Sequence, residues 1–284
     1  MPLRDWLRQG ETRLRTGPHA VRAQRDAETL LLHLTGKNRG WLLAHLDDEF
    51  GECKSIGYSQ LIDRRLAGEP IQYITGECEF YGLPFRVNRD VLIPRPETEH
   101  LVEKVLELAP NFERPRIVDV GTGSGAIAVA LAYKLPAARV TATDISRAAL
   151  NVARGNAERN EVAERIRFLE SDLLGPVAGE RFEFVVSNPP YVADGDRETL
   201  AVEVRNYEPE LALFAGANGM DVYRRLTPLA YEALVPGGFA VFEIGHGQAA
   251  SIAELFEATG FSEIQFTKDL QGIDRVIAGR RLTS

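Results

Sequence analysis

The chain has 284 residues, of which 44% are hydrophobic, 26% charged and 8% aromatic, as in globular proteins of one or two domains. Its net charge of −8 disfavours a protein that coats nucleic acid through its overall field, although a local basic groove remains compatible with it. Cys53 and Cys78 form no C-x-x-C motif, and the apolar runs are far shorter than the ~18–20 residues of a membrane span. These features exclude disordered, collagen-like, disulfide-stapled and membrane-spanning proteins.

The first 66 residues show helical periodicity, with apolar side chains spaced by three and four and with glycine-containing breaks at 16–18 and 35–38. Six of the first 25 residues are Arg, but this stretch has no serine and no apolar signal-peptide core. We therefore expect a mature cytoplasmic protein whose early arginines mostly form a solvated helix face. Residues 1–80 hold 11 basic and 12 acidic residues, whereas the remaining 204 hold 22 and 29, so the acidic surplus lies in the second part.

Residues 79–93 alternate apolar and turn-forming residues, which predicts a β-hairpin between two domains. After it, short apolar strands alternate with helices, which is typical of a mostly parallel sheet covered on both faces. The expected strands are 116–120, 139–143, 166–169, 182–187, 239–244, 261–266 and 275–278. The expected helices are 126–135, 147–160, 223–234 and 249–259. We thus predict a helical domain at 1–78, a hairpin linker at 79–93 and an α/β domain at 94–284.

A glycine loop follows the first of these strands, in the order Gly121-Thr122-Gly123-Ser124-Gly125. Glycines let the backbone turn tightly and approach a ligand, and the following helix offers free N–H groups. Asp144 ends the next strand, where a carboxylate can accept hydrogen bonds from ribose hydroxyls or serve as a helix N-cap. The glycine spacing departs from the dinucleotide fingerprint G-x-G-x-x-G and favours S-adenosyl-L-methionine. Asp172 is either an adenine contact or a plain loop carboxylate.

The tetrapeptide Asn188-Pro189-Pro190-Tyr191 follows the fourth strand and suits methylation of a planar, conjugated NH₂ group. The lone pair of such a nitrogen is delocalised, so a site must hold both N–H bonds with acceptors and aim the lone pair at the methyl group. The Asn188 side-chain carbonyl and the Pro189 backbone carbonyl supply acceptors, and the two prolines fix the backbone. Tyr191 can stack on the flat group. Most of the gain would come from positioning.

With these motifs in place, nearly the whole chain resembles the HemK/PrmC family, the release-factor glutamine methyltransferases. The resemblance also rests on the sequences at 68–76, 79–82, 93–99, 208–213 and 219–221. It implies a small helical domain and a Rossmann-like, seven-stranded class I methyltransferase domain. It further implies that S-adenosyl-L-methionine donates a methyl group to the Gly-Gly-Gln glutamine (N5) of peptide-chain release factors, leaving S-adenosyl-L-homocysteine. The enzyme is expected to be a monomer without metal, membrane attachment or stable nucleic-acid binding.

The resemblance assigns site residues by position. It implies that Asn188, Pro189, Pro190 and Tyr191 hold the glutamine side chain, and that 94–98 form part of a cofactor lid. The residues implied to bind the cofactor are Asp119, Gly121, Thr122, Gly123, Ser124, Gly125, Asp144, Asp172, Leu173 and Asn188. Some relatives have an aromatic residue where Leu173 stands, which leaves stacking on the adenine open. The helical domain is expected to recognise the protein substrate, and any docking role of the early arginines would be toward the release factor or its RNA surroundings.

Other functions remain as alternatives. An adenine-amino DNA methyltransferase acts on the same kind of NH₂ group and shares the tetrapeptide, but it must flip a base and usually adds a target-recognition segment. An NAD-dependent dehydrogenase conflicts with the loop spacing, and a catalytically inactive scaffold conflicts with the intact motifs. The five histidines lack metal-ligand spacing. Glu243 ends the fifth strand near the expected site, and the sequence gives it no role beyond supporting another residue.

Overall fold

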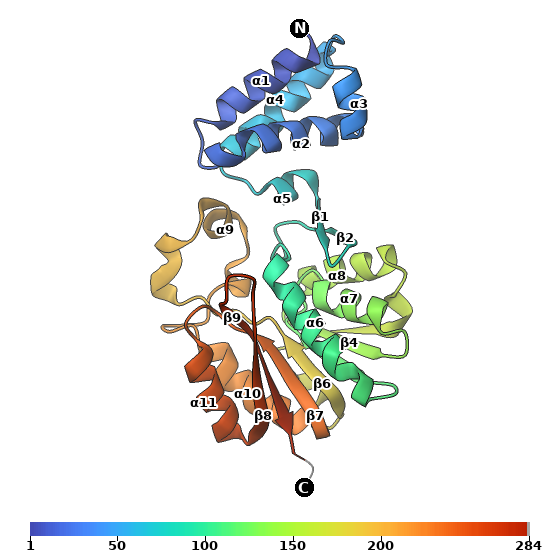
Figure 1. Ribbon diagram of the computed structural model, residues 1–284, viewed down its shortest axis with the longest axis vertical. Coiled ribbons are helices and arrows are strands. Elements are labelled where there is room, and N and C mark those ends of the chain that lie inside the picture. The colour runs from blue at the N-terminus through green and yellow to red at the C-terminus, as the bar shows by residue number, and fades with distance from the viewer. Residues whose placement is uncertain (283–284) are drawn as a thin grey trace. The chain divides into compact units, whose positions relative to one another are not determined.

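The computed structural model describes residues 1–282 and divides into two compact units (Figure 1). The first unit contains Met1–Glu77 together with Leu200–Tyr207, and the second contains the remaining residues from Cys78 onward. The short segment at 200–207 therefore belongs with the N-terminal helices, although the sequence places it inside the α/β part.

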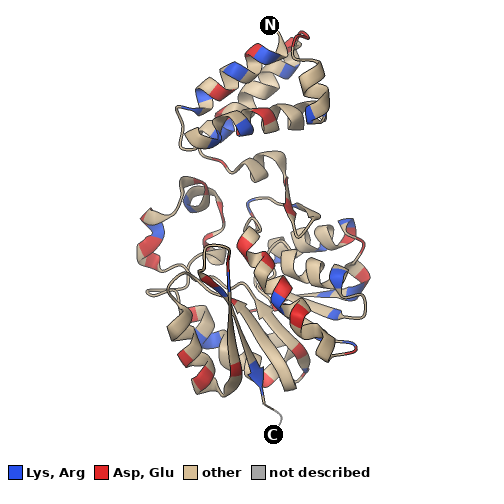
Figure 2. Cartoon of the chain, viewed as in Figure 1, with Lys and Arg blue, Asp and Glu red and all other residues tan. Residues whose placement is uncertain are grey.

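The first unit is built from helices α1 (Leu3–Leu14), α2 (Ala23–Thr35), α3 (Arg39–Ala44), α4 (Glu52–Leu66), α5 (Ile71–Thr75) and α9 (Val202–Tyr207). Its apolar core contains Leu30, Leu31 and Ile62, which confirms the helical periodicity of the sequence. Gly10 lets α1 approach α4 closely, because a Cβ at this position would lie 2.4 Å from the Tyr58 hydroxyl. Charges of both signs lie along α1, α2 and α4 (Figure 2).

The arginines of the first 25 residues largely form ion pairs in this unit. Arg4 pairs with Asp47, Arg13 with Asp63, Arg15 with Glu11 and Arg22 with Glu203. Most of these side chains are exposed, so each pair contributes little to stability. The pairs agree with the expected solvated helix face.

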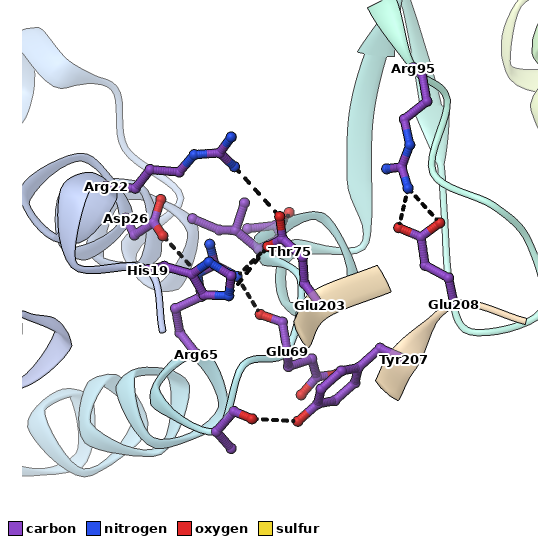
Figure 3. A network of polar contacts seen from close by, with 12 residues as sticks. His19, Arg22, Asp26, Arg65, Glu69, Thr75, Arg95, Glu203, Tyr207 and Glu208 are labelled. Atoms are coloured by element: carbon purple, nitrogen blue, oxygen red, sulfur yellow. Dashed lines mark hydrogen bonds and ion pairs between the residues drawn. The ribbon is translucent and has the colours of Figure 1, made fainter. Parts of the chain in front are cut away.

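A buried cation attaches α9 to the first unit (Figure 3). The Arg65 guanidinium is 1% exposed; its Nε donates to Asp26 Oδ2 at 2.7 Å and its Nη1 donates to Glu203 Oε2 at 3.0 Å. His19 lies 3.4 Å from the same Glu203 oxygen, and burial, followed by the charge of Arg65, lowers the pKa of His19. The Tyr207 hydroxyl donates to the Ala67 carbonyl at 3.1 Å. Polar contacts thus hold a segment from the middle of the chain against the N-terminal helices.

Within residues 1–282, the second unit contains a seven-stranded sheet in the order β5-β4-β3-β6-β7-β9-β8. The strands are β3 (Arg116–Val120), β4 (Arg139–Asp144), β5 (Ile166–Glu170), β6 (Phe182–Ser187), β7 (Leu234–Glu243), β8 (Phe261–Lys268) and β9 (Asp274–Arg281). The pairs from β5 to β7 are parallel, and β9 pairs antiparallel with both β7 and β8. The expected seven-stranded, mostly parallel sheet is confirmed.

Helices cover both faces of this sheet (Figure 1). They are α6 (Glu99–Leu108), α7 (Ala126–Lys134), α8 (Arg147–Arg159), α10 (Asp221–Ala233) and α11 (Ala249–Thr259). Successive strand residues point to opposite faces, so Ile117 packs into the core under α6 and α7 while Val118 packs into the core with α10 and α11. Because both faces are covered, the inner strands are apolar throughout, as expected for parallel sheets.

The predicted hairpin at 79–93 is shorter in the structure. Strands β1 (Glu77–Phe80) and β2 (Leu83–Arg86) pair with each other, and residues 87–95 form no strand. Asn88 Oδ1 accepts a hydrogen bond from the Asp90 N–H at 3.0 Å, which closes a turn. Val87, Val91 and Ile93 are nevertheless buried. Their alternation reflects burial of an irregular segment rather than a continued strand.

Candidate active site

A cavity of about 260 Å³ lies in the second unit, where the carboxyl ends of β3, β4 and β6 meet. From β3, the chain adds β4 and β5 on one side and then β6 and β7 on the other. Ligands of open α/β sheets usually bind at such a point, where the strand order reverses. Residues implied by the resemblance make up much of the lining: Gly121, Thr122, Gly123, Ser124, Asp144, Asp172, Leu173, Asn188, Pro189 and Pro190. The fold thus brings the glycine loop and the tetrapeptide to one cavity because β3 and β6 are parallel neighbours.

The glycine loop turns sharply between β3 and α7. Gly121, Gly123 and Gly125 have φ angles of 72°, 55° and 81°, which residues with a side chain rarely adopt. A Cβ at Gly121 or Gly123 would meet no atom within 4 Å, whereas a Cβ at Gly125 would lie 3.0 Å from Ala153 Cβ. The first two glycines therefore leave open space beside the cavity, and the third permits close contact between α7 and α8.

Asp119 supports this loop from the core. Its carboxyl group is fully buried and does not line the cavity, and its Oδ2 accepts a hydrogen bond from the Thr122 hydroxyl at 2.6 Å. Burial raises the pKa of Asp119 to about 7, while the bond from Thr122 opposes the rise. Asp119 is therefore positioned to hold the loop rather than to reach a ligand directly.

Asp144 joins the end of β4 to the glycine loop. Its Oδ2 accepts from the Gly123 N–H at 2.8 Å, and its Oδ1 accepts from the Ser146 N–H at 2.8 Å. Burial raises its pKa, and these two backbone donors oppose the rise. Ser146, not Asp144, is the N-cap of α8, since its side chain accepts from the Ala149 N–H. Each Asp144 oxygen retains capacity for a further donor, such as a ribose hydroxyl.

Asp172 and Leu173 line the cavity after β5. Asp172 is exposed, and its Oδ2 accepts from Arg225 Nη2 at 2.5 Å. Leu173 has a φ of 59°, a left-handed conformation that costs a β-carbon-bearing residue roughly 1–3 kcal/mol. This strained backbone brings the Leu173 side chain into the lining, where it provides an apolar surface.

The tetrapeptide leaves β6 with Asn188, Pro189 and Pro190 in the cavity wall, whereas Tyr191 lies outside the lining. The Tyr191 carbonyl accepts from Gln248 Nε2 at 3.1 Å, and burial raises the pKa of its phenol. Asn188 Nδ2 donates to Thr98 Oγ1 at 3.1 Å. The structure thus places a conformationally fixed amide beside the glycine loop.

Thr98 and Glu243 are the polar partners that sequence reasoning left without a specific task. Thr98 ends a short 3₁₀ helix, Pro96–Thr98, and lines the cavity, while Glu243 ends β7. The Thr98 hydroxyl lies 2.6 Å from Glu243 Oε2, and both residues are buried, at 4% and 2% exposure. From the sequence, the available clue was that each residue lies at the end of a strand or helix. The sheet order is needed to show that Thr98 contacts both Asn188 and Glu243.

Arg95 anchors the segment that precedes Thr98 (Figure 3). It lines the cavity, and its Nη2 donates to both carboxylate oxygens of Glu208, at 2.7 and 2.8 Å. The Glu208 side chain is 1% exposed and the Arg95 side chain 30%, so the carboxylate of this ion pair is removed from water. Pro94, Arg95 and Thr98 all line the cavity.

Within residues 1–282, no group of three or more His, Cys, Asp or Glu side chains could hold a metal ion. In the same residues, no helix is long and apolar enough to cross a membrane.

Comparisons with known proteins match both units. The PrmC N-terminal domain model matches residues 5–76, and the Methyltransferase small domain model matches residues 97–205. A release factor glutamine methyltransferase of Koribacter versatilis is 44% identical over 91% of this chain and 91% of its own length. That of Moorella thermoacetica is 43% identical over 99% of each chain. The crystal structure of a methyltransferase from Pyrococcus furiosus shares the fold, with a TM-score of 0.52, 20% identity and coverage of 72% of this chain and 91% of that one.

Proposed function

The chain belongs to the release factor glutamine methyltransferase family, and we propose that it methylates the Gly-Gly-Gln glutamine of peptide-chain release factors at the side-chain nitrogen N5. The observation that carries this proposal is the shared cavity, in which Asn188 and Pro189 lie beside the glycine loop. An acceptor site for a planar amide thus adjoins a site for a methyl donor. Release factors act in translation, so the reaction would take place in the cytoplasm.

The donor end of the cavity fits S-adenosyl-L-methionine. Gly121 and Gly123 leave open space where side chains would stand, and Asp144 offers carboxylate capacity for ribose hydroxyls. Asp172 reaches the adenine amino group in this proposal, and Leu173 presents an apolar side chain to the base. When bound, S-adenosyl-L-methionine supplies a methyl group activated by a positively charged sulfur.

The acceptor end would bind and orient the glutamine amide. Asn188 Oδ1 accepts one N–H of the substrate and the Pro189 carbonyl accepts the other, which directs the nitrogen lone pair toward the methyl group. Two fixed acceptors stabilise the transition state, because the nitrogen and its hydrogens gain positive charge as the bond to the methyl group forms. The nitrogen loses its proton after transfer, so the residues here need no strong base. Holding the two reactants in line can contribute about 7–11 kcal/mol.

Tyr191 has a structural task in this proposal. Its carbonyl is held by Gln248 and its phenol is largely buried, so it fixes the end of the tetrapeptide from outside the cavity. The first unit, which matches the PrmC N-terminal domain, would recognise the protein substrate.

Methyl transfer from labelled S-adenosyl-L-methionine tests the proposal. Purified release factor, its Gly-Gly-Gln Gln-to-Ala variant and duplex DNA serve as three acceptors. Label on the release factor that disappears in the Ala variant is the expected result. Label on duplex DNA alone would instead assign the enzyme to adenine-amino methylation, and donor binding without label on any acceptor would indicate an inactive scaffold.

A further inference from the structure

Three side chains from separate parts of the second unit form a linear hydrogen-bonded chain. Asn188 Nδ2 lies 3.1 Å from Thr98 Oγ1, and Thr98 Oγ1 lies 2.6 Å from Glu243 Oε2. Thr98 and Glu243 are separated by 145 residues in the sequence, and both are almost fully buried. Burial of Thr98 and Glu243 strengthens the hydrogen bond between them, while Asn188 is half-buried in the cavity wall.

Counting the hydrogen atoms fixes the direction of the chain. An ionised Glu243 only accepts hydrogen bonds, and the Thr98 hydroxyl has a single hydrogen. That hydrogen goes to the carboxylate, which leaves Thr98 Oγ1 able only to accept from Asn188. The Asn188 amide must then turn its NH₂ group toward Thr98. Its Oδ1 is left for a ligand in the cavity that Asn188 lines.

A protonated Glu243 permits the opposite direction. It can donate to Thr98 Oγ1, which can then donate its own hydrogen to Asn188 Oδ1. The Asn188 amide would rotate by about 180°, a change that costs little because its two ends have nearly the same shape. Asn188 would then present N–H groups to the N–H groups of a substrate amide, and the acceptor would be lost.

We propose that Thr98 and Glu243 are positioning residues that keep the Asn188 amide oxygen turned toward the substrate amide. This inference rests on the proposed function of Asn188 and adds the groups that select one of its two orientations. Asn188 is the catalytic residue, since it touches the substrate, whereas Thr98 and Glu243 act through it.

Charged and titratable groups surround Glu243 on several sides. Burial raises its pKa to about 7; the Thr98 hydroxyl and Arg275 of β9 oppose the rise, Glu97 adds to it, and Tyr191 opposes it. Tyr223 of α10 donates from its hydroxyl to the Glu243 backbone carbonyl at 2.7 Å. The orientation of Asn188 therefore depends on pH near neutrality, with the productive orientation above the pKa of Glu243.

Kinetics of full-length variants test the positioning role. Thr98→Val replaces the hydroxyl by a methyl group of similar size, so kcat for the release factor should fall about 10- to 100-fold while the Kd for S-adenosyl-L-methionine stays within about threefold. Thr98→Ser keeps the hydroxyl and should restore kcat to within about threefold of the wild type. Thr227→Val is the matched control: within the described residues, Thr227 Oγ1 is buried without a hydrogen-bond partner. An unchanged kcat in Thr98→Val, or an equal loss in Thr98→Ser, overturns the proposal.

Glu243→Gln covers the case in which Thr98→Val fails to fold. A neutral amide at 243 can donate to or accept from Thr98, so it no longer selects one orientation of Asn188. At pH 8, kcat should therefore be lower than in the wild type. Between pH 6 and 8, kcat should also rise less steeply than in the wild type. A wild-type pH profile retained in Glu243→Gln overturns the proposal.

Nuclear magnetic resonance separates this inference from the proposed function. With selectively ¹⁵N-labelled asparagine, the Asn188 side-chain NH₂ should show one hydrogen protected from exchange in the wild type and in Thr98→Ser, and none in Glu243→Leu or Thr98→Val. This measurement needs no acceptor substrate. An enzyme that fails to methylate release factor but keeps this signature refutes the function alone, whereas an unprotected Asn188 NH₂ in the wild type refutes the positioning chain.

Discussion

The two ends of the cavity are built in different ways. The donor end is shaped mainly by backbone, namely glycines with positive φ and the turn into α7, and the Asp144 carboxylate is tied to that backbone through the Gly123 N–H. The acceptor end depends on side chains that meet from residues 98, 188 and 243. Backbone groups do not change protonation state near neutral pH, and local turns fix their positions. A side-chain site has to be oriented by its neighbours, and those neighbours bring their own protonation states.

Asn188→Ala should give the largest effect and separates the two ends. Removal of the acceptor should lower kcat more than about 100-fold, as for other groups that contact developing charge. The Kd for S-adenosyl-L-methionine, measured by calorimetry, should change less than about threefold because the glycine loop is untouched. A comparable collapse of kcat and donor affinity would show that the ends are not independent.

Asp144→Ala should reverse this pattern. The Gly123 N–H and the Ser146 N–H lose their acceptor, and a carboxylate for the ribose disappears. Donor affinity should fall about 10- to 100-fold, while kcat at saturating donor stays within several-fold of the wild type. Asp194→Ala removes an exposed aspartate outside the cavity lining and serves as the control. A fall in kcat without a change in Kd would place Asp144 at the wrong end.

Gly125→Ala tests the backbone character of the donor end. The φ of 81° and the 3.0 Å approach to Ala153 Cβ predict a loss of about 1–3 kcal/mol in the free energy of unfolding, measured with denaturant. Gly155→Ala in α8 is the matched control. A Cβ at Gly155 meets no atom within 4 Å, so this change should stabilise the protein by about 0.5–1 kcal/mol. Equal stabilities of the two variants would contradict the predicted strain.

The buried carboxyl group of Glu243 predicts a smaller, pH-dependent effect on stability. Its folded-state pKa of about 7 lies above its ordinary value of 4.5. Between these values the folded state holds a proton that the unfolded state has lost, so this contribution is present below 4.5 and is lost as the pH rises through 7. The unfolding free energy should decline as the pH rises from 5.5 to 7.5, and this decline should be smaller in Glu243→Gln than in the wild type. The difference between the two declines should be on the order of 1 kcal/mol. Identical slopes would show that Glu243 stays ionised throughout. The charged form favoured for catalysis is then the less stable one.

Much of the fold follows from local patterns in the sequence. The strands at 116–120 and 182–187 and the helix at 249–259 have the predicted bounds, and the other predicted strands and helices differ from the observed ones by a few residues at one or both ends. Strand β7 begins earlier than predicted, at Leu234, because Leu234 already pairs with Phe182 of β6. The turn-forming residues at 235–238 lie in an irregularity where the register with β6 shifts. Helix α6 was not predicted, although its buried Leu101, Val102 and Val105 have helical spacing.

In the candidate site, too, local motifs could be predicted from the sequence and tertiary contacts could not. The glycine loop and the tetrapeptide are contiguous, so the sequence identifies their residues and the parallel sheet brings them together. The sequence does not show that Asp119 is buried beneath the loop, that Tyr191 lies outside the cavity lining, or that Thr98 meets Glu243. These facts depend on which strands are neighbours and on where side chains point, and both are tertiary properties.

The attachment of α9 to the first unit has a consequence for synthesis on the ribosome. Arg65 emerges 138 residues before Glu203, a delay on the order of ten seconds at elongation rates of about 5–20 residues per second. During that interval the N-terminal helices have Asp26 as a carboxylate partner for a cation that is buried in the finished protein. The N-terminal unit therefore reaches its final form only after most of the sheet has been translated. Deletion of residues 1–80 would likewise remove Arg65, the partner of Glu203, and Ala67, the partner of Tyr207.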